Sequence, residues 1–306
     1  MNTMNAVSTD VTMDFEDFVS EIKRRLQERY TDCEVKVARA DKNNGLRLMG
    51  ITIMPPDRQT APNIYLDSFY EDYREGRSVD SVISGIIGLY EANMTEKDIA
   101  LPDIRDFGAV KDIICCRLVN MGRNLERLEG IPHRPFLDLA VVYYLPVSVN
   151  TRYDGSITVT DKMAALWRVD EADLYRYAMS NTQRLFRVRL QALEELIREQ
   201  APDWDGDGPI VPLYVLRCES PGGAAAMLFG HLLREFATDH GDFYILPSST
   251  HEVLLHPVIR PHTKEDDRSM CRMVQSVNWK ELEPDEILSD NAYLYHADTD
   301  TIEVLG

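Results

Sequence analysis

The spacing of apolar residues in the first third of the chain predicts an amphipathic helix followed by a β-hairpin. Apolar side chains recur at helical spacing from Phe15 to Tyr30. Alternation then predicts two strands joined by the segment 41–45, whose Asn and Gly residues tolerate the positive φ of a hairpin turn. The expected elements are strands over 33–40, 46–54 and 63–66 and helices over 67–75 and 78–92. We therefore predict an N-terminal α-β-β-β-α unit over residues 14–98. Residues 1–13 are expected to be a mobile arm.

The middle segment, 99–200, has a less regular pattern of apolar positions. Its expected elements are an apolar run over 113–119, a polar helix over 120–129, a proline-flanked loop at 131–135, strands over 137–147 and 157–160, and helices over 171–179 and 188–200 with a break near 180–182. We interpret it as a middle α/β segment that ends in paired helices.

The last third has the clearest succession of strand and helix patterns. The stretch 201–212 is rich in Pro, Gly and Asp, which predicts an acidic linker before a C-terminal α+β unit at 213–306. The expected elements are strands over 211–218, 242–246, 253–259, 293–296 and 301–305, a turn at 221–223, and helices over 224–237 and 264–277. This β-α-β-β-α-β-β order predicts a sandwich with helices on one sheet face, and an α+β fold for the whole chain.

The composition is that of an acidic globular protein. Of 306 residues, 51 are Asp or Glu and 33 are Lys or Arg, which gives a formal net charge of −18. This balance argues against binding to nucleic-acid phosphates or anionic membranes, because both require clustered Lys and Arg. The acidic residues are scattered, which favours a role in solubility; an acidic mimic of a nucleic-acid surface is the alternative.

The cysteines and the N-terminus bear on the cellular compartment. The five cysteines are dispersed and form no C-x-x-C motif, which is typical of reduced, buried thiols in a cytoplasmic protein. No uncharged run reaches the roughly 18 residues of a membrane span. Residues 1–13 contain no basic residue and no long apolar stretch, so they do not have the pattern of a secretory signal.

A polar cluster, Ser248–Glu252, lies between two apolar segments and brings candidate nucleophiles, a histidine and a carboxylate together. Its H-E-x-x-x-H spacing is one residue longer than the zinc-protease motif, so a zinc site would need ligands from distant segments such as Asp242 or His262. A metal-assisted hydrolase is therefore one hypothesis for this cluster. Its candidate catalytic residues are Ser249, His251, Glu252 and His256.

The same cluster has a structural interpretation. Ser249 and Glu252 have the S-x-x-E spacing by which a hydroxyl and a carboxylate satisfy free main-chain N–H groups. The strained turn of a serine hydrolase requires glycines beside the nucleophilic serine, and no glycine flanks the serines here. These features favour a structural turn whose rim is a candidate binding surface.

Three aspartates resemble the beginning of a calcium-binding loop. Asp203, Asp205 and Asp207 alternate and precede Gly208, so their side chains would converge on one ion. The twelfth position of such a loop requires a bidentate Glu, but here it is Tyr214. The pattern favours an acidic linker over a calcium site, so no cofactor is expected, and calcium and zinc are the alternatives.

Other segments offer candidate binding surfaces rather than catalytic groups. Pro221-Gly222-Gly223 follows a strand and precedes a predicted helix, where main-chain N–H groups can hold phosphate. No phosphate-loop motif is present, so close helix–sheet packing is the favoured interpretation. Aromatic and acidic residues around Tyr70 form a candidate partner surface. The candidate binding residues are His133, Arg134, Ser248, Thr250 and Tyr70.

Several segments resemble one known family, domain-of-unknown-function family 5688, whose members are uncharacterised proteins of gut clostridia. The segments are LRLMGITI at 46–53, APNIYLDSFYEDYREGRSVDSVISGIIGLYE at 61–91, PHRPFLDLAVVYYLPV at 132–147, FYILPSSTHEVLLHP at 243–257 and LSDNAYLYHADTDTIEV at 288–304. The resemblance covers nearly the whole chain after residue 14. It implies a bacterial, cytoplasmic protein with one conserved architecture, but it carries no activity and no catalytic residue.

The sequence therefore predicts a non-catalytic binding or interaction protein. The absence of a complete catalytic motif, together with many aromatic and acidic residues, favours an unknown protein partner over nucleic acid or membrane. The metal-assisted hydrolase and the acidic mimic are the alternative hypotheses.

Overall fold

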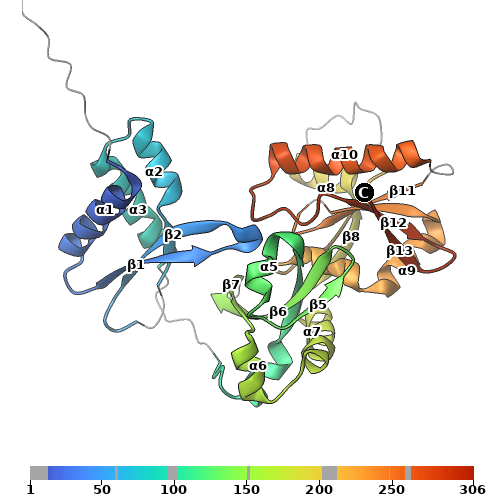
Figure 1. Ribbon diagram of the computed structural model, residues 1–306, viewed down its shortest axis with the longest axis horizontal. Coiled ribbons are helices and arrows are strands. Elements are labelled where there is room, and N and C mark those ends of the chain that lie inside the picture. The colour runs from blue at the N-terminus through green and yellow to red at the C-terminus, as the bar shows by residue number, and fades with distance from the viewer. Residues whose placement is uncertain are drawn as a thin grey trace, which may run out of the picture. The chain divides into compact units, whose positions relative to one another are not determined.

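The computed structural model describes residues 13–58, 61–94, 102–149, 152–201, 212–247, 249–258 and 263–306. These residues divide into two compact units, and Figure 1 labels most of their helices and strands. The first unit comprises 13–42 and 47–94; the second comprises the turn 43–46 and the described residues from 102 onward. The predicted arm and acidic linker lie almost entirely outside the described residues. No helix within the described ranges is long and apolar enough to cross a bilayer.

The first unit has the predicted elements. Its helices are α1 (Phe15–Arg29), α2 (Asp67–Arg74) and α3 (Val79–Asn93), and its strands are β1 (Glu34–Asp41), β2 (Arg47–Met54) and β3 (Asn63–Tyr65). Helix α1 begins where the Asp14 carboxylate accepts a hydrogen bond from the main-chain N–H of Asp17. The strands form an antiparallel sheet in the order β1-β2-β3.

The hydrophobic core of the first unit follows the predicted apolar stripes. Phe18, Ile22 and Leu26 of α1 are fully buried, as are Ile51 and Ile53 of β2. On β2 the buried residues Ile51 and Ile53 alternate with less buried ones, which places one face of the sheet against the helices. The helical and strand periodicities of the sequence thus explain which residues form the core of this unit.

The second unit contains two antiparallel sheets. The four-stranded sheet consists of β4 (Cys115–Asn120), β5 (His133–Phe136), β6 (Leu139–Val149) and β7 (Arg152–Thr158), and β6 pairs with each of the other three. The six-stranded sheet has the order β13-β12-β10-β11-β9-β8, formed by β8 (Val188–Ala192), β9 (Tyr214–Cys218), β10 (Phe243–Leu246), β11 (Val253–Pro257), β12 (Ala292–His296) and β13 (Thr301–Leu305).

Helices cover both faces of the six-stranded sheet. The helices of this unit are α4 (Phe107–Val110), α5 (Leu125–Leu128), α6 (Asp161–Trp167), α7 (Glu171–Leu185), α8 (Leu193–Gln200), α9 (Gly230–His240) and α10 (Lys264–Glu281), with 3-10 turns η2 (Lys111–Ile113), η3 (Gly122–Asn124) and η4 (Gly223–Leu228). Helix α10 packs on Tyr244 and Leu294, whereas α9 packs on the opposite face with Phe243 and Tyr295. The prediction from the sequence that the helices cover one sheet face was therefore wrong. The predicted α+β class is confirmed.

Four local predictions in the second unit were wrong. Residues 188–192 form strand β8 instead of helix, 223–228 form a 3-10 turn, and the loop at 131–135 contains strand β5. Helix α7 continues through the predicted break at 180–182. The Asn181 side chain donates to the main-chain oxygens of Lys111 and Ile114, and the Thr182 hydroxyl accepts from the Cys116 N–H, so tertiary contacts stabilise these polar residues inside the helix.

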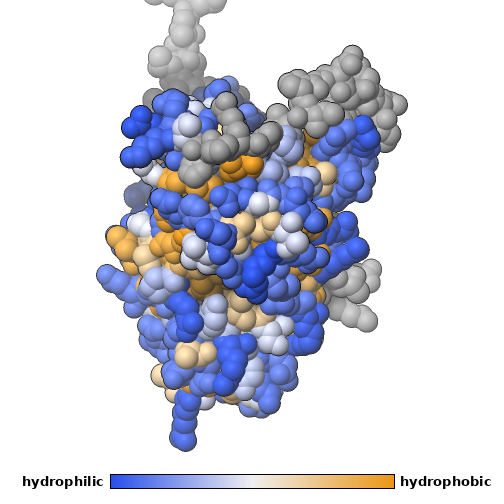
Figure 2. All heavy atoms as spheres, turned by 90° about the vertical axis from the view of Figure 1, so that its right-hand side faces the viewer, coloured by the Kyte–Doolittle hydropathy of each residue, from blue (hydrophilic) through white to orange (hydrophobic). Residues whose placement is uncertain are grey.

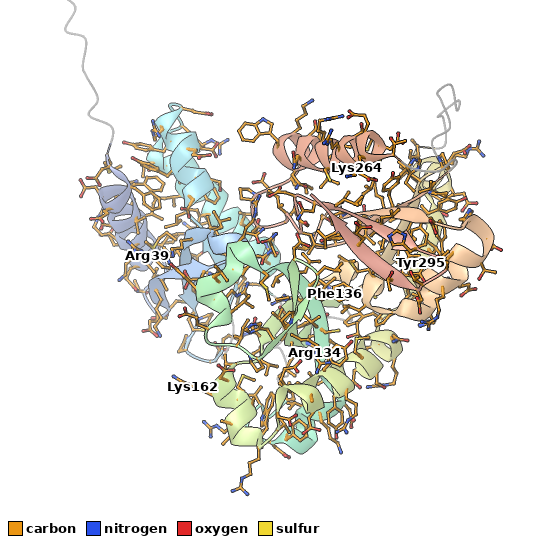
Figure 3. All side chains as sticks on the ribbon, turned by 45° about the vertical axis from the view of Figure 1, so that its right-hand side comes forward. Arg39, Arg134, Phe136, Lys162, Lys264 and Tyr295 are labelled. Atoms are coloured by element: carbon orange, nitrogen blue, oxygen red, sulfur yellow. The ribbon has the colours of Figure 1, made fainter. Side chains whose placement is uncertain are left out.

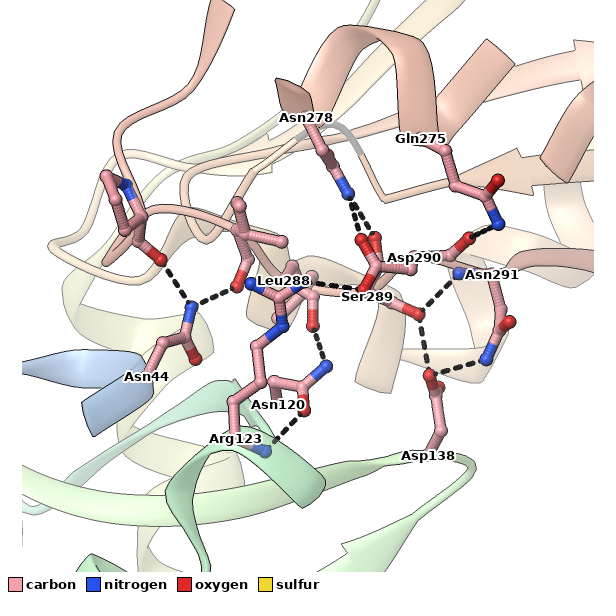
Figure 4. Close-up of polar contacts among 12 residues, drawn as sticks. Asn44, Asn120, Arg123, Asp138, Gln275, Asn278, Leu288, Ser289, Asp290 and Asn291 are labelled. Atoms are coloured by element: carbon pink, nitrogen blue, oxygen red, sulfur yellow. Dashed lines mark hydrogen bonds and ion pairs between the residues drawn. The ribbon is translucent and has the colours of Figure 1, made fainter. Parts of the chain in front are cut away.

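A polar network joins the two sheets of the second unit (Figure 4). The Asp138 carboxylate, in the turn between β5 and β6, accepts hydrogen bonds from Ser289 Oγ (2.6 Å), Asn291 Nδ2 (3.0 Å) and Tyr293 Oη (2.6 Å). Burial, and then the Asp138 carboxylate, raise the pKa of Tyr293 above its ordinary value, so the phenol stays protonated and donates. The three hydrogen bonds give this carboxylate a structural role.

Cys115, Cys116 and Cys218 are buried free thiols in the core of the second unit. Burial raises the pKa of Cys116 to about 11 and that of Cys115 and Cys218 to about 12, so all three are neutral and unreactive near neutral pH. They contribute to the core as small apolar side chains.

Candidate functional site

The predicted polar cluster is a hydrogen-bonded turn between β10 and β11. Ser249 is buried, and its hydroxyl accepts from the His251 N–H at 3.0 Å while its own N–H donates to the Glu252 main-chain oxygen at 3.3 Å. The main chain of Thr250 bonds to Glu286 and to Ala224. Ser248, which was predicted to contribute to the rim, lies outside the described residues. The Ser249 hydroxyl thus stabilises the turn.

The ionisable residues of this turn have separate partners. His251 Nε2 lies 3.5 Å from a carboxylate oxygen of Glu286, and Glu252 lies 3.5 Å from Arg217. The ring of His256 is directed elsewhere, with Nδ1 3.2 Å from the main-chain oxygen of Pro212. The structure therefore brings Ser249, His251 and Glu252 into one turn, but it shows no hydrogen bond between the serine hydroxyl and the imidazole.

Among the residues that the structure describes, no group of three His, Cys, Asp or Glu side chains is positioned to hold a metal ion. The calcium candidates Asp203, Asp205 and Asp207 lie outside the described residues, as does His262.

The remaining predicted surface residues contact their own unit. Arg134 makes a bidentate ion pair with Glu171 of α7, with N–O distances of 2.8–3.3 Å, and its guanidinium lies 3.9 Å from the centre of the Tyr175 ring. His133 Nδ1 lies 3.0 Å from the main-chain oxygen of Ile131. Tyr70 donates to the main-chain oxygen of Met13 and packs among aromatic residues of the first unit. Arg134 thereby stabilises the docking of α7 on the four-stranded sheet.

A groove with a volume of about 500 Å³ lies between α10 and strand β13 of the second unit. Helix α10 forms one wall and begins at a capping box, in which the Thr263 and Asp266 side chains each bond to the other's main-chain N–H. The thiol of Cys271 donates to the Leu305 main-chain oxygen at 3.2 Å and holds the helix against the strand. The groove is lined by Lys264, Asp267, Arg268, Cys271, Arg272, Gln275, Glu303, Val304, Leu305 and Gly306.

A basic stripe runs along the helix wall of this groove. Lys264, Arg268 and Arg272 are four residues apart, so they lie on one side of α10; Figure 3 labels Lys264. Glu265 is 2.9 Å from Arg272 and 3.8 Å from Arg268, and all three side chains are more than 60% exposed. Exposed ion pairs of this kind contribute little to stability, so the arginines can exchange Glu265 for another carboxylate at small cost.

The other wall of the groove is an open sheet edge. Strand β13 pairs with β12 and is the last strand of the six-stranded sheet on that side. Its outer main-chain N–H and C=O groups have no strand partner within the described residues, which is the arrangement to which an additional strand binds. Val304 is an exposed apolar residue on this strand.

The face of the protein drawn in Figure 2 is predominantly polar. Figure 2 shows hydrophilic residues over most of one face, with hydrophobic residues in small patches. The distinguishing features of the groove are the regular positive charge of its lining and its free strand edge, and not a large apolar area.

Comparison with known proteins gives one match. The model of a family of unknown function, DUF5688, matches residues 15–297. The chain belongs to DUF5688. The match includes all of α10, whereas β13 lies just beyond it. No curated protein and no solved structure matches this DUF5688 chain.

This groove was not among the sites predicted from the sequence. The i, i+4, i+8 spacing of Lys264, Arg268 and Arg272 is visible in the sequence and would have indicated a basic helix face. The position of β13 at the sheet edge beside this face depends on strand order, which the sequence pattern does not give.

Proposed function

We propose that this protein is a non-catalytic binding protein that holds an acidic, extended segment of a partner protein in the groove between α10 and β13. The observation that carries the proposal is a row of three basic side chains facing an open sheet edge in a chain of net charge −18. An added strand would bond to the main chain of β13, and its carboxylates would pair with Arg268 and Arg272.

The charge of the protein supports an acidic partner segment. Acidic residues outnumber basic ones over the chain, so an acidic segment is repelled from most of the surface. The groove lining has three basic and two acidic residues, and Lys264 makes no ion pair with a described residue. Its acidic residues have local partners, since Asp267 accepts from Tyr244 and Glu303 lies 3.0 Å from His296. Electrostatic steering thus favours the groove over other sites.

A binding role fits the rest of the second unit better than the hydrolase hypothesis does. The serine, histidine and carboxylate at 249–252 each have other partners, as described above. The buried, neutral thiols fit the reducing, cytoplasmic setting that we propose for the protein.

Charge reversal in the groove tests this proposal. In affinity purification from native cells, Arg268→Glu with Arg272→Glu is expected to lose at least about 90% of a partner that wild-type protein captures, because both carboxylate contacts become repulsive. The control is Arg176→Glu with Arg198→Glu, which reverses two exposed arginines on α7 and α8.

The control should retain the partner, and the wild-type complex should dissociate as salt is raised. Equal capture by wild type and by the groove variant would contradict the proposal, as would capture that is insensitive to salt.

A further inference from the structure

Arg117 lies on the four-stranded sheet and has no acidic partner among the residues that the structure describes. It sits on β4 in register with Val142 of β6. Its side chain extends across β6, where the guanidinium lies 5.1 Å from the centre of the Tyr144 ring. It reaches β7 and donates from Nη1 to Ser156 Oγ at 3.2 Å and from Nη2 to Thr158 Oγ1 at 3.1 Å.

Both of these acceptors are neutral. A guanidinium has more N–H donors than these hydroxyls accept, and no carboxylate among the described residues pairs with Arg117. Burial, and then the charge of Arg127, lower the pKa of Arg117 to about 10. Holding a cation in such a place without a counter-ion is energetically costly. The residue as a whole is only partly buried, so part of it remains in contact with solvent.

A second arginine converges on the same hydroxyl. Arg127 of α5 donates from Nη2 to Thr158 Oγ1 at 3.4 Å, so two guanidinium groups contact one oxygen atom. Arg127 has other interactions as well, and its charge lies close enough to Arg117 to lower the pKa of that residue. An anion between them would replace repulsion with two attractive contacts.

Tyr144 and Gly222, which contact Arg117, are also compatible with a bound anion. Tyr144 is fully buried, and within the described part of the chain its Oη has no hydrogen-bond partner of normal geometry, although interaction with the Ser220 hydroxyl acts to lower its pKa. Burial raises this pKa, so the phenol is a neutral donor. Gly222 packs directly on Arg117, since a Cβ at Gly222 would lie 2.3 Å from the Arg117 Cβ. The cluster thus combines two cations with three or more hydroxyl groups.

We propose that Arg117, Arg127, Ser156, Thr158 and Tyr144 form a binding site for a tetrahedral oxyanion, namely phosphate or the phosphate group of a ligand. Guanidinium groups match phosphate oxygens in geometry and charge. The number of donors around Arg117 exceeds what the two oxygens of a carboxylate can accept, and it fits the additional oxygens of phosphate. This site is independent of the groove between α10 and β13.

Titration with inorganic phosphate tests the site. Isothermal titration calorimetry and thermal denaturation of the full chain are carried out at constant ionic strength with potassium chloride as balance. We expect phosphate to bind with one-to-one stoichiometry and to raise the melting temperature with concentration. Arg117→Lys should weaken binding by at least about tenfold, because lysine loses the forked hydrogen bonding. Acetate should produce no comparable effect.

Two further variants separate binding from packing. Arg189→Lys changes an arginine paired with Glu219 on the other sheet and should leave phosphate binding unchanged. Arg117→Met should bind no phosphate, yet melt no lower than wild type in phosphate-free buffer, because it removes a cation that lacks a counter-ion.

The proposal is overturned if phosphate raises the melting temperature of wild type no more than chloride does, or if Arg117→Lys binds it equally well. Equal binding of acetate overturns the tetrahedral class of ligand. A lower melting temperature for Arg117→Met in phosphate-free buffer assigns Arg117 to packing and also overturns the proposal.

Discussion

Replacing Gly223 with alanine is expected to lower the free energy of unfolding of the second unit by about 3 kcal/mol or more. A Cβ at this position would lie 2.1 Å from the main-chain oxygen of His251 and 2.6 Å from that of Cys218. Both contacts are to main chain, so neither can be relieved by rotating a side chain. The turn 249–252 or the end of β9 would have to move. Urea denaturation followed by circular dichroism measures the change.

The matched control is Gly130→Ala in the same unit. A Cβ at Gly130 meets no atom within 4 Å, so this change is expected to alter the free energy of unfolding by no more than about 0.5 kcal/mol. If the two variants are equally stable, then the close packing of the 222–223 turn on the 249–252 turn is not the constraint that the structure indicates.

Replacing Asp138 with alanine is expected to cost about 3–5 kcal/mol, because it removes the acceptor for three side chains at once. Ser289, whose bond to Asp138 is drawn in Figure 4, and Tyr293 are both fully buried, so their hydroxyl groups would lose a strong partner in a place where water has little access. The measurement is again the free energy of unfolding from urea denaturation.

A double-mutant cycle with Tyr293→Phe tests whether the network is the cause. Once the Tyr293 hydroxyl is absent, Asp138→Ala should cost less than it does in wild type, since one of the donors it would leave unpaired is gone. Strictly additive effects of the two changes would contradict a direct contribution from this hydrogen bond.

The elements that the sequence predicted well are those with a long periodic pattern of their own. The stripe of apolar residues in α1 and the alternation in β1 and β2 each specify a buried face without reference to distant residues. Helix α10 begins with a capping box that is visible in the sequence as Thr263-x-x-Asp266.

The elements that the sequence missed depend on contacts with distant segments. Residues 188–192 carry a weak pattern and become a strand because β9 is available as an antiparallel partner. The alanines at 224–226 favour a helix by propensity, but Gly223 is held against His251 and the chain forms a 3-10 turn.

The two proposed sites could not be predicted from the sequence because each depends on segments that are far apart in the chain. The sequence argued against phosphate binding at Gly222-Gly223 because no phosphate-loop motif is present. Arg117, which packs on Gly222, belongs to β4 and is far from Gly222 in the sequence. In the groove, the spacing of the basic residues is local, but the open edge beside them follows from strand order. Sequence patterns reveal local chemistry, and the fold determines which of those groups meet.

Photo-crosslinking from the edge of β13 tests the binding proposal most directly. A photoreactive amino acid replaces Val304 in the groove or, as the control, Leu166 on α6, both of which are exposed. In native cells, irradiation of the Val304 variant is predicted to give one principal adduct, whose crosslinked peptide is rich in Asp and Glu. This adduct should disappear when Arg268→Glu and Arg272→Glu are added. A Val304 pattern that matches the Leu166 pattern, or an adduct that persists after charge reversal, would contradict the proposed function.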